Sequence, residues 1–227
     1  MKRYTDIFFD LDHTLWDFDK NSELAFNKIF KLNFPEIDAK KFIKAYIPIN
    51  HACWKMFQKD LITHQELRYK RLKESFDAIN VTIDDGSIEK IANDYLEFLP
   101  ENNHLFEGTI EILDYLKPKY KLHIITNGFA EVQEKKLNNS NIKHYFLTIT
   151  NSEMAGVKKP NPIIYKYALN VSNAQKETSI MIGDCIDADV LGAINFGMDA
   201  VLFNQGNHDI QENITQIHHL LELQKHL

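Results

Sequence analysis

Short apolar runs and longer stretches with helical spacing follow one another along the chain. Residues 7–9, Ile-Phe-Phe, are too few for a helix, and their aromatic and β-branched side chains suit a strand buried on both faces. Comparable short runs predict four further strands, at residues 122–126, 146–150, 179–182 and 200–203. Helical patterns lie between and after them, at residues 109–116, 131–139, 162–169, 190–196 and 214–223. This alternation predicts an α/β fold, a Rossmann-like parallel sheet of about five strands with helices on both faces.

The connection between the first and second predicted strands is much longer than the others. Roughly 30 residues suffice for an ordinary strand-helix-strand unit, and the surplus here is nearly all helical. Its helical patterns cover residues 22–32, 38–57, 63–76 and 84–99. We expect the second of these helices to be bent or broken at Pro48, and Thr63 with Glu66 to form a capping box at the start of the third. We therefore predict an all-helical cap domain at residues 17–99, inserted into an α/β core domain made of residues 1–16 and 100–227.

Polar side chains follow the first strand directly. Asp10 and Asp12 are two residues apart, and the hydroxyl of Thr14 is two residues further on. In an open α/β sheet, ligands bind at the carboxyl edge where these side chains are expected. Neighbouring carboxylates repel one another unless a cation lies between them or one stays protonated. Because Mg²⁺ prefers oxygen ligands, the pattern favours a magnesium site, although an Asp-x-Asp beside a strand also occurs for purely structural reasons.

The composition narrows the class of protein. The chain has 227 residues, 44% of them hydrophobic, which is enough for one large domain with a sizeable insertion. A net charge of -6 with scattered basic residues argues against a nucleic-acid polymer as partner, and no run approaches the roughly 18 apolar residues of a membrane helix. Cys53 and Cys185 are too few for a disulfide framework. We therefore expect a cytoplasmic protein, a monomer or a homodimer, that acts on a small molecule.

Further polar residues fall at the expected ends of other strands. Thr126 and Asn127 follow the second strand, Lys159 lies in a loop, and Asp184 and Asp189 follow the fourth. The four stretches read FFDLDHTL, IITNG, VKKPNP and IGDCIDADVLGA. In order and spacing they resemble the four motifs of the haloacid dehalogenase-like (HAD) hydrolase superfamily. The resemblance covers nearly the whole chain, and the helical insertion is similar to the C1-type cap of that family.

The resemblance implies a role for each motif residue. Asp10 would be the nucleophile that forms an aspartyl-phosphate, and Asp12 would be the general acid and base. Mg²⁺ would be held by the carboxylates of Asp10 and Asp184 and by the backbone carbonyl of Asp12. The substrate phosphate would be bound by Thr126, Asn127, Gly128 and Lys159. Asp189 and Thr14 would support these residues without touching the substrate. A purely structural explanation remains for the residues of the later motifs: they could end a strand, carry a surface charge in a loop, or cap a helix.

The same resemblance bears on reaction type and substrate. Dehalogenases of the superfamily lack a carboxylate at the position of Asp12, because a halide leaves without a proton, so a phosphomonoesterase is implied. The stretches TLWDF, INHACWKMFQKDLITHQELRYKRL and NGFAEVQEKKLNNSNIKHYF resemble the noncanonical pyrimidine nucleotidase branch, which implies a 5′-nucleotidase for pyrimidine nucleoside monophosphates. Candidate specificity residues in the cap are His51, Trp54, Arg68 and Arg71. Trp54 could stack on a base and Arg68 could pair with an anionic edge, but core packing and helix salt bridges are the simpler alternatives.

Three other functions stay open from the residues. A sugar-phosphate or phosphoglycolate-type phosphatase would use the same core motifs. A 2-haloacid dehalogenase predicts halide release without a metal. A non-catalytic binding protein predicts that Asp10→Asn leaves the biological role intact.

Overall fold

The computed structural model describes residues 4–206 and 214–227. The chain forms two compact units, one made of Met1–Phe18 with His104–Leu227 and the other of Asp19–Asn103. Parallel strands and helices make up the first unit, and helices make up the second. The helical unit is thus an insertion in the sequence of the α/β unit.

A six-stranded sheet forms the centre of the α/β unit, and each neighbouring pair of strands is parallel. The strands are β1 (Asp6–Phe9), β2 (Lys121–Thr126), β3 (Thr148–Asn151), β4 (Ser179–Gly183), β5 (Asp199–Phe203) and β6 (Gln216–Ile217). Their order is β3-β2-β1-β4-β5-β6, so β1 lies between β2 and β4. The predicted α/β fold with a parallel sheet is confirmed, with one strand more than expected.

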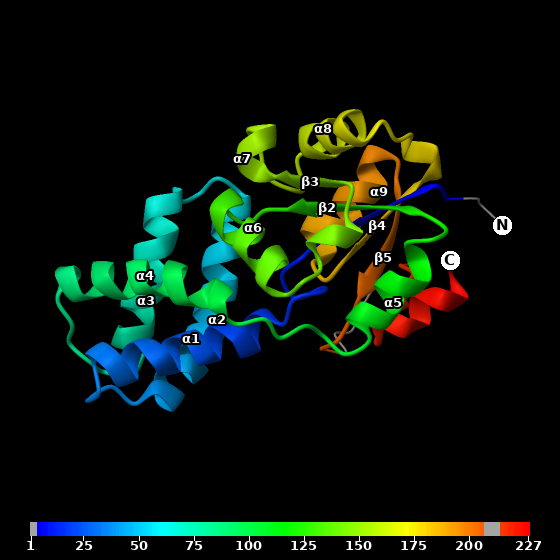
Figure 1. Ribbon diagram of the computed structural model, residues 1–227. Helices are drawn as coiled ribbons and strands as arrows, with labels where there is room; N and C mark the ends of the chain where they lie inside the picture. Colours follow the sequence, from blue (N-terminus) through cyan, green and yellow to red (C-terminus); the bar gives the residue numbers. More distant parts are fainter. Residues whose placement is uncertain (1–3, 207–213) are drawn as a thin grey trace. The chain divides into compact units, whose positions relative to one another are not determined.

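Both faces of the sheet are covered by apolar contacts. The helices of this unit are α5 (Thr109–Leu116), α6 (Ala130–Asn139), α7 (Ser152–Ala155), α8 (Pro162–Ser172) and α9 (Gly192–Phe196). Phe8 belongs to a buried core with Ile164 of α8 and Ala193 of α9. Successive strand residues point to opposite faces, and the ring of Phe9 lies 6.4 Å from that of Phe146. In Figure 1, α8 is drawn above the strands and α5 below them.

The end of the chain departs from its expected course. We expected one helix over residues 214–223, and this is wrong: β6 and a 3-10 helix, η5 (Leu220–Lys225), occupy this stretch. Ile217 pairs with Phe203 of β5 and is fully buried. The backbone amide of His219 donates to the Glu222 carboxylate over 2.8 Å at the start of η5. Strand pairing and this cap therefore outweigh the helical spacing of the apolar residues.

Two other boundaries also differ from the prediction. The strand expected at residues 146–150 begins at Thr148, because a 3-10 turn, η2 (Lys143–Tyr145), precedes it and Phe146 closes that turn. A π-helical turn, η4 (Ile186–Leu191), precedes α9 where an ordinary helix was expected from residue 190. π-Helical turns are frequent at functional sites.

A buried polar network joins the first three strands away from their carboxyl ends. His123 on β2 is fully buried, and its Nε2 lies 3.1 Å from Asp6 Oδ1. Its Nδ1 lies 2.8 Å from Thr148 Oγ1, and its ring stacks on Phe8 at 4.7 Å between centroids. Burial lowers the pKa of His123 below its ordinary value, although the carboxylate of Asp6 opposes the shift and Lys121 adds to it. The imidazole is therefore held in its neutral form.

This network predicts an acid-sensitive contribution to stability. Because the pKa of His123 is lower in the folded state than in the unfolded chain, the unfolded chain binds more protons as the pH falls below about 6.5. We expect the free energy of unfolding to fall more between pH 7.5 and 5.5 in the wild type than in His123→Gln. Urea denaturation of both proteins at the two pH values measures this difference. Identical pH dependence in both would contradict the prediction.

The helical unit is held together by aromatic side chains from all its long helices. These are α1 (Phe18–Asn33), α2 (Ala39–Gln58), α3 (His64–Ala78) and α4 (Asp85–Phe98), followed by the short η1 (Leu99–Glu101). The ring of Phe26 on α1 lies 4.6 Å from both Tyr46 on α2 and Tyr95 on α4. Phe42 and Phe76 join α2 to α3 with ring centroids 4.7 Å apart. Edge-to-face and stacked ring pairs of this kind add to the free energy of apolar burial.

Local signals set the ends of these helices largely as predicted. Thr63 and Glu66 form both hydrogen bonds of a capping box at the start of α3, which confirms the predicted cap. Of the bend or break expected at Pro48, the break is wrong, since α2 continues through this residue as one helix of 20 residues. Its buried residues on both sides of the proline, among them Tyr46 and Phe57, keep the two halves on one apolar face. Tertiary packing thus compensates for the missing backbone hydrogen bond.

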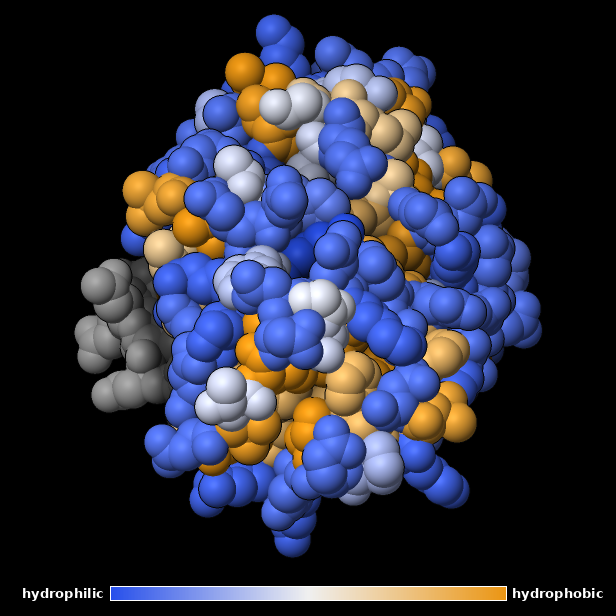
Figure 2. All heavy atoms as spheres, turned by 90° about the vertical axis from the view of Figure 1, so that its left-hand side faces the viewer, coloured by the Kyte–Doolittle hydropathy of each residue, from blue (hydrophilic) through white to orange (hydrophobic). Residues whose placement is uncertain are grey.

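Within residues 4–206 and 214–227, none of the helices combines the length and apolar character needed to cross a bilayer. The face drawn in Figure 2 is mostly hydrophilic, with apolar side chains gathered in separate patches.

Candidate active site

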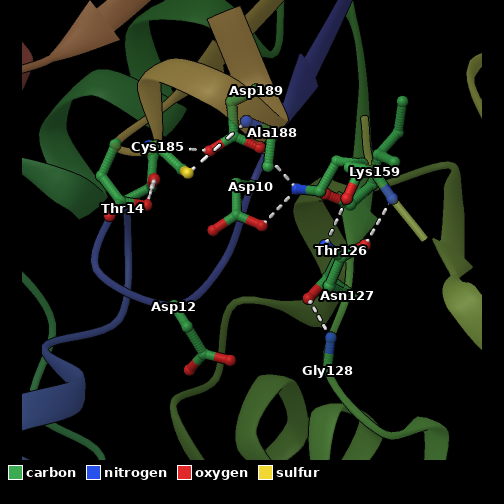
Figure 3. Close-up of polar contacts among 12 residues, drawn as sticks. Asp10, Asp12, Thr14, Thr126, Asn127, Gly128, Lys159, Cys185, Ala188 and Asp189 are labelled. Atoms are coloured by element: carbon green, nitrogen blue, oxygen red, sulfur yellow. Dashed lines mark hydrogen bonds and ion pairs between the residues drawn. The ribbon is translucent and has the colours of Figure 1, made fainter. Parts of the chain in front are cut away.

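The carboxyl ends of three neighbouring strands bring the motif residues together. Asp10 follows β1, Thr126 ends β2, and Asp184 follows β4. Since these strands are parallel and adjacent, their ends meet at one edge of the sheet. Lys159 enters the same place from the loop between α7 and α8, and Asp189 enters from η4 (Figure 3).

Lys159 is the centre of this arrangement. Its Nζ donates to Asp10 Oδ1 over 2.6 Å, to Asp189 Oδ1 over 2.7 Å and to the carbonyl of Ile125 over 2.7 Å. The ammonium has three hydrogens, so each has an acceptor, although the residue is only 2% exposed. Burial alone would lower the pKa of Lys159, but the carboxylates of Asp10 and Asp189 raise it above its ordinary value. The lysine is thus a permanently charged bridge between Asp10 and Asp189.

Three carboxylates crowd around this single ammonium. Oxygen atoms of Asp10, Asp184 and Asp189 lie within 4.8 Å of one another. Burial raises the pKa of Asp10 well above its ordinary value; Lys159 opposes this shift, and Asp189 and Asp184 add to it. Burial, with the neighbouring Asp189, also raises the pKa of Asp184 to about 8. The excess negative charge and the all-oxygen donor set fit a divalent cation such as Mg²⁺.

The oxygens of Asp189 already have partners. Oδ1 accepts from Lys159, and Oδ2 accepts from the backbone amide of Cys185 over 3.0 Å. A Cβ atom on Gly183 would lie 2.3 Å from Asp189 Cγ, so only glycine allows this close approach. Thr14 Oγ1 donates to Asp184 Oδ1 over 3.3 Å. Asp189 is therefore an anchor for Lys159, which leaves Asp10 and Asp184 as the carboxylates available to a cation.

The residues after β2 secure the loop that carries Lys159. The Asn127 side chain accepts from the Lys159 backbone amide over 2.7 Å and donates to its carbonyl over 3.0 Å. The backbone amide of Gly128 donates to Thr126 Oγ1 over 3.0 Å. The structure thus brings Thr126, Asn127, Gly128 and Lys159 together, and it gives the Asn127 side chain a loop-holding contact that the motif alone did not predict.

Asp12 has partners that sequence reasoning missed. Its Oδ1 accepts from Lys136 over 2.6 Å and its Oδ2 accepts from Gln133 over 2.8 Å, both on α6. The pattern of residues 131–139 predicts a helix but no contact with the site. The signal was the spacing of three between Gln133 and Lys136, which puts both on the face that carries the apolar Leu137. Both side chains are buried.

The cap candidates all lie in the helical unit. His51 is exposed, and Trp54 is half-buried with its ring 5.5 Å from that of Phe57. Arg68 donates from Nη2 to Asn93 Oδ1 over 2.7 Å. Arg71 is buried, and its Nη1 donates to Asn50 Oδ1 over 3.1 Å within the helical interior. Their part in substrate specificity stays a prediction.

The chain is similar to several known proteins. It matches the family described as haloacid dehalogenase-like hydrolase over residues 7–203. It is 33% identical to the pyrimidine 5′-nucleotidase PynA of Streptococcus pneumoniae, over 94% of this chain and 88% of that one, and 29% identical to the pyrimidine 5′-nucleotidase YjjG of Escherichia coli, over 92% and 89%. A glyceraldehyde 3-phosphate phosphatase of Methanothermobacter thermautotrophicus is 29% identical, over 87% and 84%. The crystal structure of the HAD-hydrolase YfnB of Bacillus subtilis bound to magnesium has a TM-score of 0.88 at 28% identity, covering 100% of this chain and 99% of that one.

These similarities settle the class to which the fold and the motif residues pointed. The chain belongs to the haloacid dehalogenase-like hydrolase family. The resemblance that the four motifs predicted is thereby confirmed, and so is the prediction of an enzyme of the hydrolase class.

Proposed function

We propose that the protein is a Mg²⁺-dependent phosphomonoesterase that acts through an aspartyl-phosphate on Asp10, with pyrimidine nucleoside 5′-monophosphates as its main substrates. The observation that carries this proposal is the Asp10 carboxylate, fixed by Lys159 at 2.6 Å and placed beside Asp184. A carboxylate becomes an effective nucleophile toward phosphate once positive charge offsets their mutual repulsion.

The reaction would take two steps on this chain. In the first, an oxygen of Asp10 attacks phosphorus, the ester P–O bond breaks, and a proton from Asp12 goes to the leaving oxygen, which releases the alcohol. In the second, water attacks the phosphorus of the aspartyl-phosphate, Asp12 takes the water proton, and the P–O bond to Asp10 breaks. Lys159, whose three N–H groups already have acceptors, would offset the charge of the phosphate through its nearby positive charge.

The donor set supports Mg²⁺ as the cofactor. Asp10 and Asp184 would hold the ion with their carboxylates, and Asp12 with its backbone carbonyl. When bound, the ion supplies charge neutralisation and orients the phosphate. The magnesium found in the related YfnB structure supports the same assignment.

The nucleotide preference rests on the relatives. Two of them, PynA and YjjG, are named pyrimidine 5′-nucleotidases. A sugar-phosphate phosphatase is the second candidate, because the glyceraldehyde 3-phosphate phosphatase is also 29% identical over most of the chain. The carboxylate of Asp12 disfavours a dehalogenase, which needs no proton donor. Small phosphorylated metabolites and two free cysteines, Cys53 and Cys185, favour a cytoplasmic enzyme.

A substrate panel tests the proposal. Phosphate release is measured with dUMP, dTMP, UMP, dAMP, glyceraldehyde 3-phosphate, glucose 6-phosphate and phosphoglycolate, with Mg²⁺ and with EDTA. We expect the highest kcat/KM with a pyrimidine nucleotide and loss of activity with EDTA. A preference for sugar phosphates would replace the nucleotide assignment by the second candidate. Metal-independent halide release from 2-chloropropionate, with no phosphate release, would contradict the phosphatase itself.

A further inference from the structure

We infer that Gln133 and Lys136 of α6 are positioning residues, which hold the carboxylate of Asp12 in one orientation and make the Thr126 hydroxyl a donor to the substrate phosphate. The inference rests on the proposed function and deepens it, because it assigns the acid–base step two supporting side chains. The four side chains come from the α/β unit, around the ends of β1 and β2.

Each oxygen of Asp12 receives one donor. Lys136 Nζ lies 2.6 Å from Oδ1 and Gln133 Nε2 lies 2.8 Å from Oδ2. Two contacts on separate oxygens fix the plane of a carboxylate, whereas a single contact would leave it free to rotate. The donors are almost fully buried, while the Asp12 side chain keeps 22% of its surface exposed. Asp12 is therefore held from behind and stays open toward solvent, where a substrate would approach.

Aromatic rings hold Lys136 in place. Its ammonium lies 4.3 Å from the ring centroid of Trp16 and 5.3 Å from that of Phe18. Ring faces attract cations, so the two rings help to keep the ammonium directed at Asp12. Both rings belong to the segment that follows Asp12 in the sequence. The same segment therefore carries the Asp12 carboxylate and the rings that contact the Lys136 ammonium.

Gln133 also determines what the Thr126 hydroxyl can do. Gln133 Nε2 donates to Thr126 Oγ1 over 2.7 Å, and the Gly128 amide donates to the same oxygen over 3.0 Å. A hydroxyl oxygen has two acceptor sites, and both are occupied. The hydroxyl hydrogen of Thr126 is therefore left to donate elsewhere, as a phosphate oxygen requires.

Two further observations concern the surroundings of the Gln133 side chain. Gln133 Oε1 is buried and has no hydrogen-bond partner among the described residues. The N–H groups of the same amide both have acceptors, on Asp12 and on Thr126. A Cβ atom on Gly128 would lie 2.2 Å from Gln133 Nε2, and only glycine leaves room for this approach.

The leaving group provides a readout that a general structural defect would not reproduce. An alkyl phosphate such as a nucleoside 5′-monophosphate needs a proton on its leaving oxygen, whereas p-nitrophenolate leaves without one. Misplacing Asp12 should therefore slow the first step for the alkyl ester and spare the aryl ester. The quantity to compare is kcat/KM, because it reports the steps up to the first irreversible bond cleavage.

The variants are Lys136→Met, Lys136→Arg and Gln133→Leu, with Lys135→Met as the matched control. Lys135 is the neighbouring lysine on α6, is exposed and pairs with Glu131. For Lys136→Met we expect kcat/KM to fall about 100-fold with dUMP and less than about threefold with p-nitrophenyl phosphate, since a misplaced catalytic group loses about this much. Lys136→Arg should recover part of the loss, and Lys135→Met should match the wild type. Gln133→Leu should show the same loss with dUMP, a smaller loss with p-nitrophenyl phosphate because both esters bind through their phosphate, and weaker competitive inhibition by inorganic phosphate, which Lys136→Met leaves unchanged.

The outcomes separate the two proposals. Equal losses with both esters, or no loss beyond that of Lys135→Met, would overturn the positioning role while the wild type remains an active phosphatase. Inhibition by phosphate that is unchanged in Gln133→Leu would overturn the donor assignment of Thr126. A wild type that hydrolyses neither ester would overturn the proposed function and the positioning role together. Thermal unfolding of each variant shows that the folded enzyme is being compared.

Discussion

Phosphate release is expected to fall by a factor of at least about 1,000 when Asp10 is replaced by asparagine. The amide has nearly the volume of the carboxylate but cannot attack phosphorus. Lys159 keeps a charged partner in this variant, because Asp189 Oδ1 remains 2.7 Å from its ammonium. One of the three crowded carboxylates loses its charge, so the free energy of unfolding should stay the same or rise.

Two measurements on the same samples test this expectation. Initial rates with the preferred nucleotide give the loss of activity, and urea denaturation gives the change in stability. Asp187→Asn is the control, since Asp187 is an exposed carboxylate on the same turn as Asp189 and should leave both values unchanged. Activity above a tenth of the wild-type rate in Asp10→Asn would contradict a nucleophilic role for Asp10.

The second large effect is expected on stability. Lys159→Met removes the ammonium that joins Asp10 to Asp189 and leaves two buried carboxylates without it. Removing one partner from a buried ion pair lowers the free energy of unfolding by about 3 to 5 kcal/mol. Activity should be lost as well, because the phosphate loses its main cationic partner. Lys158→Met, on the neighbouring and less buried lysine, should lower the free energy of unfolding by much less than Lys159→Met.

The loss in Lys159→Met should also depend on pH, in a direction set by the carboxylates. The pKa values of Asp10 and Asp184 are already raised in the folded protein, that of Asp184 to about 8, and Lys159 holds both down. Without the lysine, the folded state binds still more protons than the unfolded chain, so stability falls as the pH rises. Urea denaturation should therefore show a smaller deficit at pH 5.5 than at pH 8. An equal deficit at both pH values would contradict this charge-based explanation.

Sequence patterning predicted most of the α/β unit because its strands are buried on both faces. The apolar runs around Phe8 and Met181 are too short to form helices. The polar residue that ends each run marks the edge of the sheet. The two-residue strand β6 could not be predicted in this way. Its position depends on pairing between Ile217 and Phe203, a contact between distant residues that no local pattern carries.

The candidate site shows the same limit. Asp10, Lys159 and Asp184 could be found because each follows a strand or lies in a motif of known spacing. Gln133 and Lys136 could not, because their relevance depends on which face of α6 turns toward Asp12. A helix with several polar residues can turn any of several faces toward the site. The burial of Leu137 in the core fixes which face of α6 does so.

The contact between Asn127 and Lys159 has a consequence for how this loop can vary. The side-chain amide of Asn127 forms hydrogen bonds with both the backbone N–H and the carbonyl of Lys159. These two bonds fix the position of Lys159, whatever the number of residues in the loop before it. Insertions or deletions between α7 and Lys159 should therefore change the outline of the protein there without moving the charge. We therefore expect engineered changes of length in this segment to leave the chemistry unaltered as long as Asn127 is kept.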